Sequence, residues 1–111
     1  MKFNIMMSNR TTEEVDGYLI KNTPIKCFAH KDDTYEDNPT LWVVSEFFSG
    51  MHIGSRKRTR KEAIESAMMT FEEKTLDEIK QQVNKMVKQY GFANKDGTEK
   101  KLRQKINTTK E

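Results

Sequence analysis

Apolar residues recur at three- and four-residue steps through the stretch 59–90, which is the spacing of one face of an α-helix. The start is marked by a capping box, because Thr59 can accept a hydrogen bond from the backbone N–H of Glu62. A second capping box begins at Thr75, and Gly91 suits a helix end in the left-handed conformation. We therefore expect either one long helix or two helices that break just before Thr75. The apolar face comprises Ala63, Ile64, Ala67, Met68 and Phe71, and then Leu76, Ile79, Val83, Met86, Val87 and Tyr90.

The first half of the chain alternates between apolar and polar residues, which is typical of β-strands that bury one face. Residues 2–7, 18–20 and 25–30 each show this alternation, and residues 41–48 form the strongest strand. Between the first two segments, residues 11–14 could cap a single helical turn, which a following glycine would end. The pattern therefore predicts several short strands before the helical stretch.

Ser49-Gly50 follows the strongest strand and predicts a two-residue hairpin turn, since glycine accepts the positive φ that such turns need. The turn sets a register with three cross-strand pairs: Phe48 with Met51, Glu46 with Ile53, and Val44 with Ser55. One hairpin face then meets the helix with the apolar residues Trp42, Val44, Phe48, Met51 and Ile53. The other face is mixed, and the N-terminal strands or the second helical segment are the alternatives for covering it. It bears Leu41, Val43, Phe47, His52, Arg56 and Arg58.

These elements predict an α+β fold in which a small antiparallel β-sheet packs against one long or kinked C-terminal helical segment. We expect one domain at residues 1–92 and a basic, flexible tail at residues 93–111. The chain has 111 residues, 34% hydrophobic and 33% charged, so most apolar side chains are needed in the core. No apolar run has the length of a membrane span, and no signal peptide is recognisable, so we expect a cytoplasmic protein without membrane contact.

The residue types used in enzyme chemistry are sparse. The single cysteine, Cys27, excludes an internal disulfide and fits a reducing compartment. Its place on the inward face of a strand favours a buried small residue over a nucleophile. The two histidines, His30 and His52, have no accompanying lysine or glutamate at a spacing that would make an acid–base pair. One cysteine and two separated histidines cannot form a closed zinc site. We expect no enzyme activity, no metal and no cofactor.

Charge is divided unevenly along the chain, whose net charge is +3. Residues 1–50 contain five Lys/Arg and eight Asp/Glu, whereas residues 51–111 contain fifteen and nine. Five cations flank the start of the helix, where the helix dipole normally favours acidic residues. Together with free N–H groups they would bind phosphate or another anion in a salt-dependent way. The alternative is a solvated patch that serves solubility. The five residues are Arg56, Lys57, Arg58, Arg60 and Lys61.

A second charged segment, residues 31–40, is acidic. It lacks the alternating spacing and the central glycine of a calcium-binding loop. We expect a loop that is either solvated or in contact with a basic groove of a partner protein. The predicted partner-binding residues are Asp32, Asp33, Glu36 and Asp37, to which the mixed hairpin face adds Phe47 and His52.

A strand, a turn, a second strand and a helix opening follow one another in this chain. They are Leu41-Trp42-Val43-Val44-Ser45-Glu46, Ser49-Gly50, Ile53-Gly54 and Thr59-Arg60-Lys61-Glu62-Ala63-Ile64. Residues 41–71 thereby resemble small proteins of bacterial phages and plasmids, and the size and charge are similar to those of anti-CRISPR proteins, especially inhibitors of the type II effector Cas9. That family has no fixed catalytic residues. The resemblance implies a stoichiometric binder that blocks a nucleoprotein at its guide RNA or its DNA channel, in the cytoplasm of a bacterial host.

Three functional predictions follow from different classes. The first is a non-enzymatic inhibitor that binds Cas9 or its guide RNA, as the resemblance implies. The second is a nucleic-acid-binding module that uses the basic cluster with Phe47 and His52. The third is a regulatory protein that forms a homodimer, whereas the first two are compatible with a monomer. The dimer would use Leu76, Ile79, Val83 and Met86.

Overall fold

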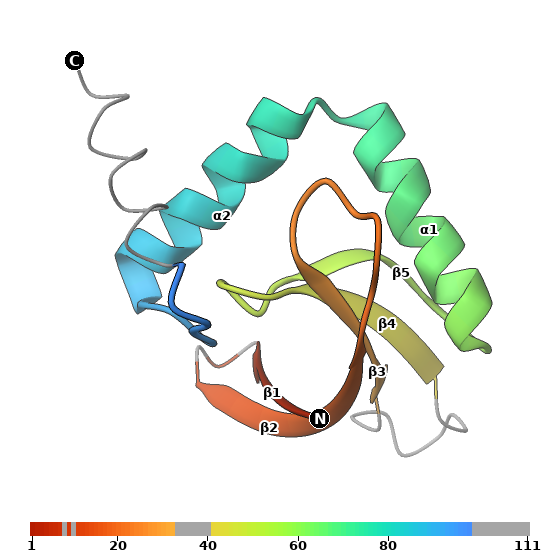
Figure 1. Ribbon diagram of the computed structural model, residues 1–111, viewed down its shortest axis with the longest axis horizontal. Helices are drawn as coiled ribbons and strands as arrows, with labels where there is room; N and C mark the ends of the chain where they lie inside the picture. Colours follow the sequence, from red (N-terminus) through yellow and green to blue (C-terminus); the bar gives the residue numbers. More distant parts are fainter. Residues whose placement is uncertain (8, 10, 33–40, 99–111) are drawn as a thin grey trace.

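The computed structural model describes residues 1–7, 9, 11–32 and 41–98, which form an α+β fold. The strands pair in the order β1-β2-β3-β4-β5, and every pair is antiparallel. Figure 1 shows a strongly curled sheet with both helices arching along one side of it. The elements are β1 (Lys2–Met6), β2 (Thr12–Leu19), β3 (Cys27–Asp32), β4 (Leu41–Glu46), β5 (His52–Lys57), α1 (Arg60–Glu73) and α2 (Leu76–Tyr90).

The sheet bends at Gly17 in β2. Residues 12–16 of β2 pair with β1, whereas residues 17–19 pair with β3. A Cβ atom at Gly17 would lie 2.8 Å from the Phe3 ring, so any side chain here would displace its neighbours. The bend brings β1 over the face of β3, where the rings of Phe3 and Phe28 stack with centroids 4.3 Å apart. The helical turn predicted at residues 11–14 is wrong, because β2 runs through this segment.

Residues that follow α2 close the outer edge of β1. The Asn94 amide donates to the carbonyl oxygens of Asn4 and Phe47 at 2.9 and 2.8 Å, and its oxygen accepts from the Asn4 N–H at 2.7 Å. Ala93 is buried, and its N–H donates to the β4–β5 turn. Ala93 and Asn94 therefore belong to the folded body and not to the predicted tail. Residues 99–111 of that tail lie outside the described residues.

Helix α1 packs on β3, β4 and β5 through small side chains. A Cβ atom on Gly54 would lie 2.8 Å from the backbone nitrogen of Ala67, which shows how closely helix and strand approach. The predicted contact between the hairpin and the helix is confirmed, although Met68, predicted on the buried face, is exposed. The buried residues are Cys27, Ala29, Val44, Ile53, Ala63 and Ala67, and Ile20, Trp42, Ile64 and Phe71 pack around them.

The opposite face of the sheet is buried as well, because β1 folds over it. Phe3, Ile5, Phe28 and Phe47 form a second core cluster there. The Phe47 ring meets the edge of Phe3 with centroids 6.1 Å apart. The N-terminal strands thus cover the mixed hairpin face, which was one of the two alternatives for this face. Phe47 is buried, so its predicted role in binding a partner is wrong.

The helical stretch consists of two helices. Lys74 is extended, with φ −104° and ψ 144°, and Thr75 then caps α2 by accepting from the Glu78 N–H at 3.2 Å. The buried side chains of helix α2 form a third core cluster. Partly buried residues that pack against this cluster are Ile25, Phe48, Met51, Phe71 and Phe92. Because Ile79 and Val83 are core residues of this chain, they cannot form the predicted dimer interface.

The connection between β4 and β5 is longer than the predicted two-residue turn. Val44 pairs with Ile53 and not with Ser55, so the predicted register is wrong by two residues. The buried carboxylate of Glu46 shapes this turn, because it accepts from the N–H groups of Phe48 and Ser49 at 2.7 Å each. A slip of two residues keeps every side chain on its face. For this reason the predicted helix-facing residues remain correct despite the wrong pairing.

Candidate functional site

Four residues from four elements meet beside the N-terminus of α1, and we call them the aromatic–basic surface. Lys31 and Trp42 are direct cross-strand partners on β3 and β4. Tyr18 of β2 lies opposite Ala29, two residues before Lys31, so the three side chains share one face of the sheet. Arg60 is the first residue of α1 and completes the group.

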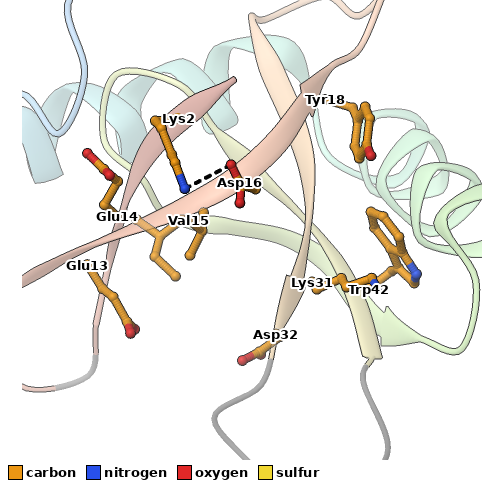
Figure 2. Close-up of a pocket in the computed structure, with 10 residues that line it drawn as sticks. Lys2, Glu13, Glu14, Val15, Asp16, Tyr18, Lys31, Asp32 and Trp42 are labelled. Atoms are coloured by element: carbon orange, nitrogen blue, oxygen red, sulfur yellow. Dashed lines mark ion pairs between the residues drawn. The ribbon is translucent and has the colours of Figure 1, made fainter.

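The cations of this surface lie against its rings. The Arg60 guanidinium carbon is 4.6 Å from the Tyr18 ring centroid and 5.9 Å from that of Trp42. Lys31 Nζ is 5.7 Å from the Trp42 ring centroid, and the two rings are 6.0 Å apart. Tyr18 is 55% exposed and Trp42 is half-buried. Figure 2 shows the two rings next to each other with Lys31 extended toward Trp42. Such cation–π contacts hold the charges beside partly open aromatic faces.

Three further residues of the predicted basic cluster lie close to Arg60 or Trp42 in sequence or in strand pairing. Lys57 pairs with Trp42 across β4 and β5, and Arg58 and Lys61 are exposed nearby in sequence. Among the described residues, no carboxylate forms an ion pair with Arg60 or with these three cations. These four positive charges therefore form no ion pair with a described carboxylate.

Arg56 differs from the rest of the cluster. Its Nε atom forms an ion pair with Asp32, whose side chain is almost completely buried. The pair joins the end of β3 to β5 and compensates both charges, so it serves the fold. Because it is in this ion pair, Arg56 differs from the other residues of the predicted anion site. Asp32 is likewise engaged inside the fold and does not lie on the predicted partner surface. The other acidic residues predicted to bind a partner, Asp33, Glu36 and Asp37, lie outside the described residues.

The two histidines lie close together, which their spacing in the sequence did not indicate. The ring centroids of His30 and His52 are 6.0 Å apart. His30 is fully buried, with Nδ1 3.0 Å from the Lys31 carbonyl oxygen and Nε2 2.8 Å from Ser45 Oγ. Burial lowers the pKa of both histidines, and the charge of Arg56 lowers that of His52 further. His30 is thus held neutral inside the core, away from any solvent-borne substrate.

Cys27 is buried, as the strand pattern predicts. Burial raises the pKa of its thiol to about 12, and the nearby Glu46 carboxylate acts in the same direction. A thiol with this pKa stays protonated at neutral pH, and the protonated form is a poor nucleophile. Cys27 therefore contributes packing to the core.

An open hollow with a volume of about 610 Å³ adjoins the aromatic–basic surface (Figure 2). It lies where β2 parts from β3. Tyr18, Lys31 and Trp42 line one side, and acidic residues of β2 line the other. The hollow therefore changes from basic and aromatic to acidic across its width. Its remaining lining residues are Lys2, Ile5, Glu13, Glu14, Val15, Asp16 and Asp32.

In the described part of the chain, no three His, Cys, Asp or Glu side chains are placed to hold a metal ion. No helix within the described ranges is long and apolar enough to cross a membrane. Comparison with known proteins found no matching family model, no matching curated protein and no matching solved structure. The geometry of the aromatic–basic surface is consequently the main basis for a functional proposal.

The basic cluster was predicted as a site from the sequence, whereas Trp42 was predicted only as a residue that packs against the helix, and Tyr18 and Lys31 were given no role in a site. The missing information was the pairing of β2 with β3 and of β3 with β4, which places these residues next to Trp42. An alternation pattern assigns a residue to a face of its own strand. It does not say which residue of another strand lies beside it.

Proposed function

We propose that the protein is a non-enzymatic binding protein that holds single-stranded nucleic acid on the aromatic–basic surface. The placement of the Arg60 guanidinium over the exposed Tyr18 ring, beside Trp42, is the observation on which this rests. Proteins that bind single strands combine aromatic rings, on which bases stack, with cations that follow the phosphates. Here the rings and the cations occur together at one corner of the sheet.

The exposed rings favour a single strand over a duplex. Bases within a duplex already stack on one another, so side-chain rings offer them little. An unpaired base can stack on Tyr18 or Trp42. The phosphates of the same strand can then contact Lys57, Arg58 and Lys61. A duplex would be held by phosphate contacts alone, with affinity that falls steeply as salt is added.

The resemblance of residues 41–71 to anti-CRISPR proteins supplies a target for such a surface. Unpaired segments of a Cas9 guide RNA offer the bases and phosphates that the surface suits, and occupying them would block assembly or activity of the effector. This form of the proposal depends on the resemblance as well as on the geometry. Competition between this protein and Cas9 for the guide RNA tests it directly.

The general proposal is tested by tryptophan fluorescence, because Trp42 is the single tryptophan of the chain and lies in the surface. Titration with single-stranded RNA and DNA oligonucleotides at two salt concentrations is expected to quench Trp42. Arg60→Ala and Lys31→Ala are each expected to weaken binding about tenfold, since each removes a positive charge beside the rings and loosens the stacking surface. A gel shift with duplex DNA is expected to show weaker binding at the higher salt.

Lys85→Ala is the matched control, because Lys85 is an exposed lysine on α2, outside the surface. It removes the same charge and is expected to leave affinity nearly unchanged. Equal losses in Arg60→Ala and Lys85→Ala would mean that net charge alone attracts the oligonucleotide. The absence of both quenching and retardation at low salt would refute nucleic-acid binding altogether.

A further inference from the structure

Strand β2 loses its second neighbour halfway along its length. Its pairs with β3 are Gly17 with His30, Tyr18 with Ala29, and Leu19 with Phe28. However, β2 begins at Thr12, and β3 continues to Asp32. Figure 2 shows the two strands together beside Tyr18 and well apart at Glu13 and Asp32. Among the described residues, 12–16 of β2 are therefore paired on one side only, with β1.

The register identifies which backbone groups are left open. The Met7 N–H donates to the Thr11 carbonyl, and the Gly17 N–H donates to the Met1 carbonyl. Odd-numbered residues of β2 thus direct their N–H and C=O groups toward β1. In a strand, successive residues direct these groups to opposite sides, so those of Thr12 and Glu14 point to the side that β3 has left. No group of the described residues pairs with them there, so within the described part of the chain this is a short, open strand edge.

The side chains along this edge are acidic. Glu13 and Glu14 are exposed, and no cation among the described residues forms an ion pair with either. Asp16 pairs with Lys2 at 3.0 Å in an exposed contact that contributes little stability. The hollow beside the edge provides room for an added chain. Tyr18 and Trp42, at the end of the hollow, already lie against cationic groups.

We propose that residues Thr12–Asp16 of β2 form a docking edge for an extended, basic peptide segment of a partner protein, which adds as a further strand. A peptide offers alternating N–H and C=O groups that match those of Thr12 and Glu14. Because Glu13 and Glu14 point to opposite faces of β2, the lysine or arginine side chains on one face of the peptide meet one of these two carboxylates. A nucleic acid has no such alternation, and its phosphates are repelled by these carboxylates. The proposal does not depend on nucleic-acid binding at the aromatic–basic surface.

The probe is an eight-residue peptide of alternating lysine and valine, with both ends blocked, titrated into the full chain. Calorimetry gives the affinity, and ¹⁵N-resolved NMR locates the contact. Binding is expected, with the largest shifts at the amides of residues 12, 14 and 16. A glutamate–valine peptide is expected not to bind, because its charge matches that of the edge. Failure of the lysine–valine peptide to bind would overturn the proposal.

Two changes remove the backbone contact while keeping the charges of the probe. A lysine–valine peptide N-methylated at alternate residues cannot donate to the edge, and loss of two hydrogen bonds is expected to weaken binding about tenfold or more. The Glu14→Pro variant removes an N–H that faces away from β1, which an edge strand tolerates. The Glu14→Pro variant is expected to keep the unfolding temperature of the unaltered protein and to lose peptide binding. Glu14→Gln is expected to weaken peptide binding less than Glu14→Pro does.

The outcomes are distinct even if Glu14→Pro fails to fold, because the methylated peptide tests the same contact on the unaltered chain. Equal binding of the methylated and unmethylated peptides would overturn strand addition. So would shifts confined to the aromatic–basic surface. A Glu14 amide that is already protected from hydrogen exchange in the free protein would show that the edge is occupied by this chain, and it would also overturn the proposal.

Discussion

The Glu46 carboxylate and the Ser49 hydroxyl lie 2.5 Å apart inside the β4–β5 turn, and both residues are fully buried. The same carboxylate accepts the backbone N–H groups of Phe48 and Ser49. Glu46→Ala leaves these donors without a partner, so we expect the free energy of unfolding to fall by about 2–4 kcal/mol in urea denaturation. Glu65→Ala, an exposed position on α1, is the control and should change it by less than about 0.5 kcal/mol. A Glu46→Ala variant as stable as this control would contradict the capping role.

The pH dependence of stability provides a second test of Glu46. Burial raises the pKa of its carboxyl above the usual 4.5, against the opposing effect of the hydrogen bonds from Ser49 and Phe48. The folded state therefore favours the protonated form. The stability it contributes is present below pH 4.5 and is lost as pH rises through the folded pKa. In Glu46→Gln this fall should disappear, as urea denaturation at several pH values would show. A parallel pH profile for both proteins would argue against a raised pKa.

His30 should remain neutral to a lower pH than an ordinary histidine does, because burial lowers its pKa. The Lys31 carbonyl can only accept, so Nδ1 carries the proton and Nε2 accepts from the Ser45 hydroxyl. Burial lowers the pKa from 6.5, so stability is present above pH 6.5 and is lost as pH falls through the folded value. NMR of ring nitrogens in the folded protein at pH 6 should show the Nδ1–H tautomer. A charged ring at that pH, or the other tautomer, would be inconsistent with this arrangement.

Two glycines with similar positive φ angles should respond differently to alanine. Gly54 and Gly91 have φ of +79° and +84°, but no atom lies within 4 Å of a Cβ at Gly91. Gly91→Ala should therefore cost only about 1–3 kcal/mol, for a backbone conformation with φ +84° and ψ −180° that is essentially restricted to glycine. At Gly54 the added atom would meet the backbone of α1, so we expect a loss of about 3 kcal/mol or more. Thermal unfolding of both variants measures the difference. Similar losses would show that α1 can move away from β5.

The helices were predictable because their signals are local. Thr59 and Thr75 cap α1 and α2 through the N–H groups three residues later, as the two capping boxes indicate. The sequence left open whether the helix breaks, because each capping box could also lie within a continuous helix. The extended conformation of Lys74 and the packing of α2 on its own core cluster resolve this.

The sheet was predicted less well because its geometry depends on contacts between distant residues. Gly17 appeared to end a local turn, yet it is the point where β2 bends over Phe28. Glu46 appeared to be an ordinary polar position in a strand, yet its buried carboxylate sets the length of the next turn. The candidate site shows the same limit. Tyr18 joins Trp42 through strand register, which no local pattern contains.

The hydrogen bonds between Asn4 and Asn94 join the beginning of the chain to a residue synthesised ninety positions later. While the protein is being made, β1 leaves the ribosome before the other described elements, and its outer side stays without these hydrogen bonds until Asn94 follows. A product truncated before Asn94 would present that side to other polypeptides, which invites aggregation. The outer side of β1 is thus closed only after Asn94 has been synthesised.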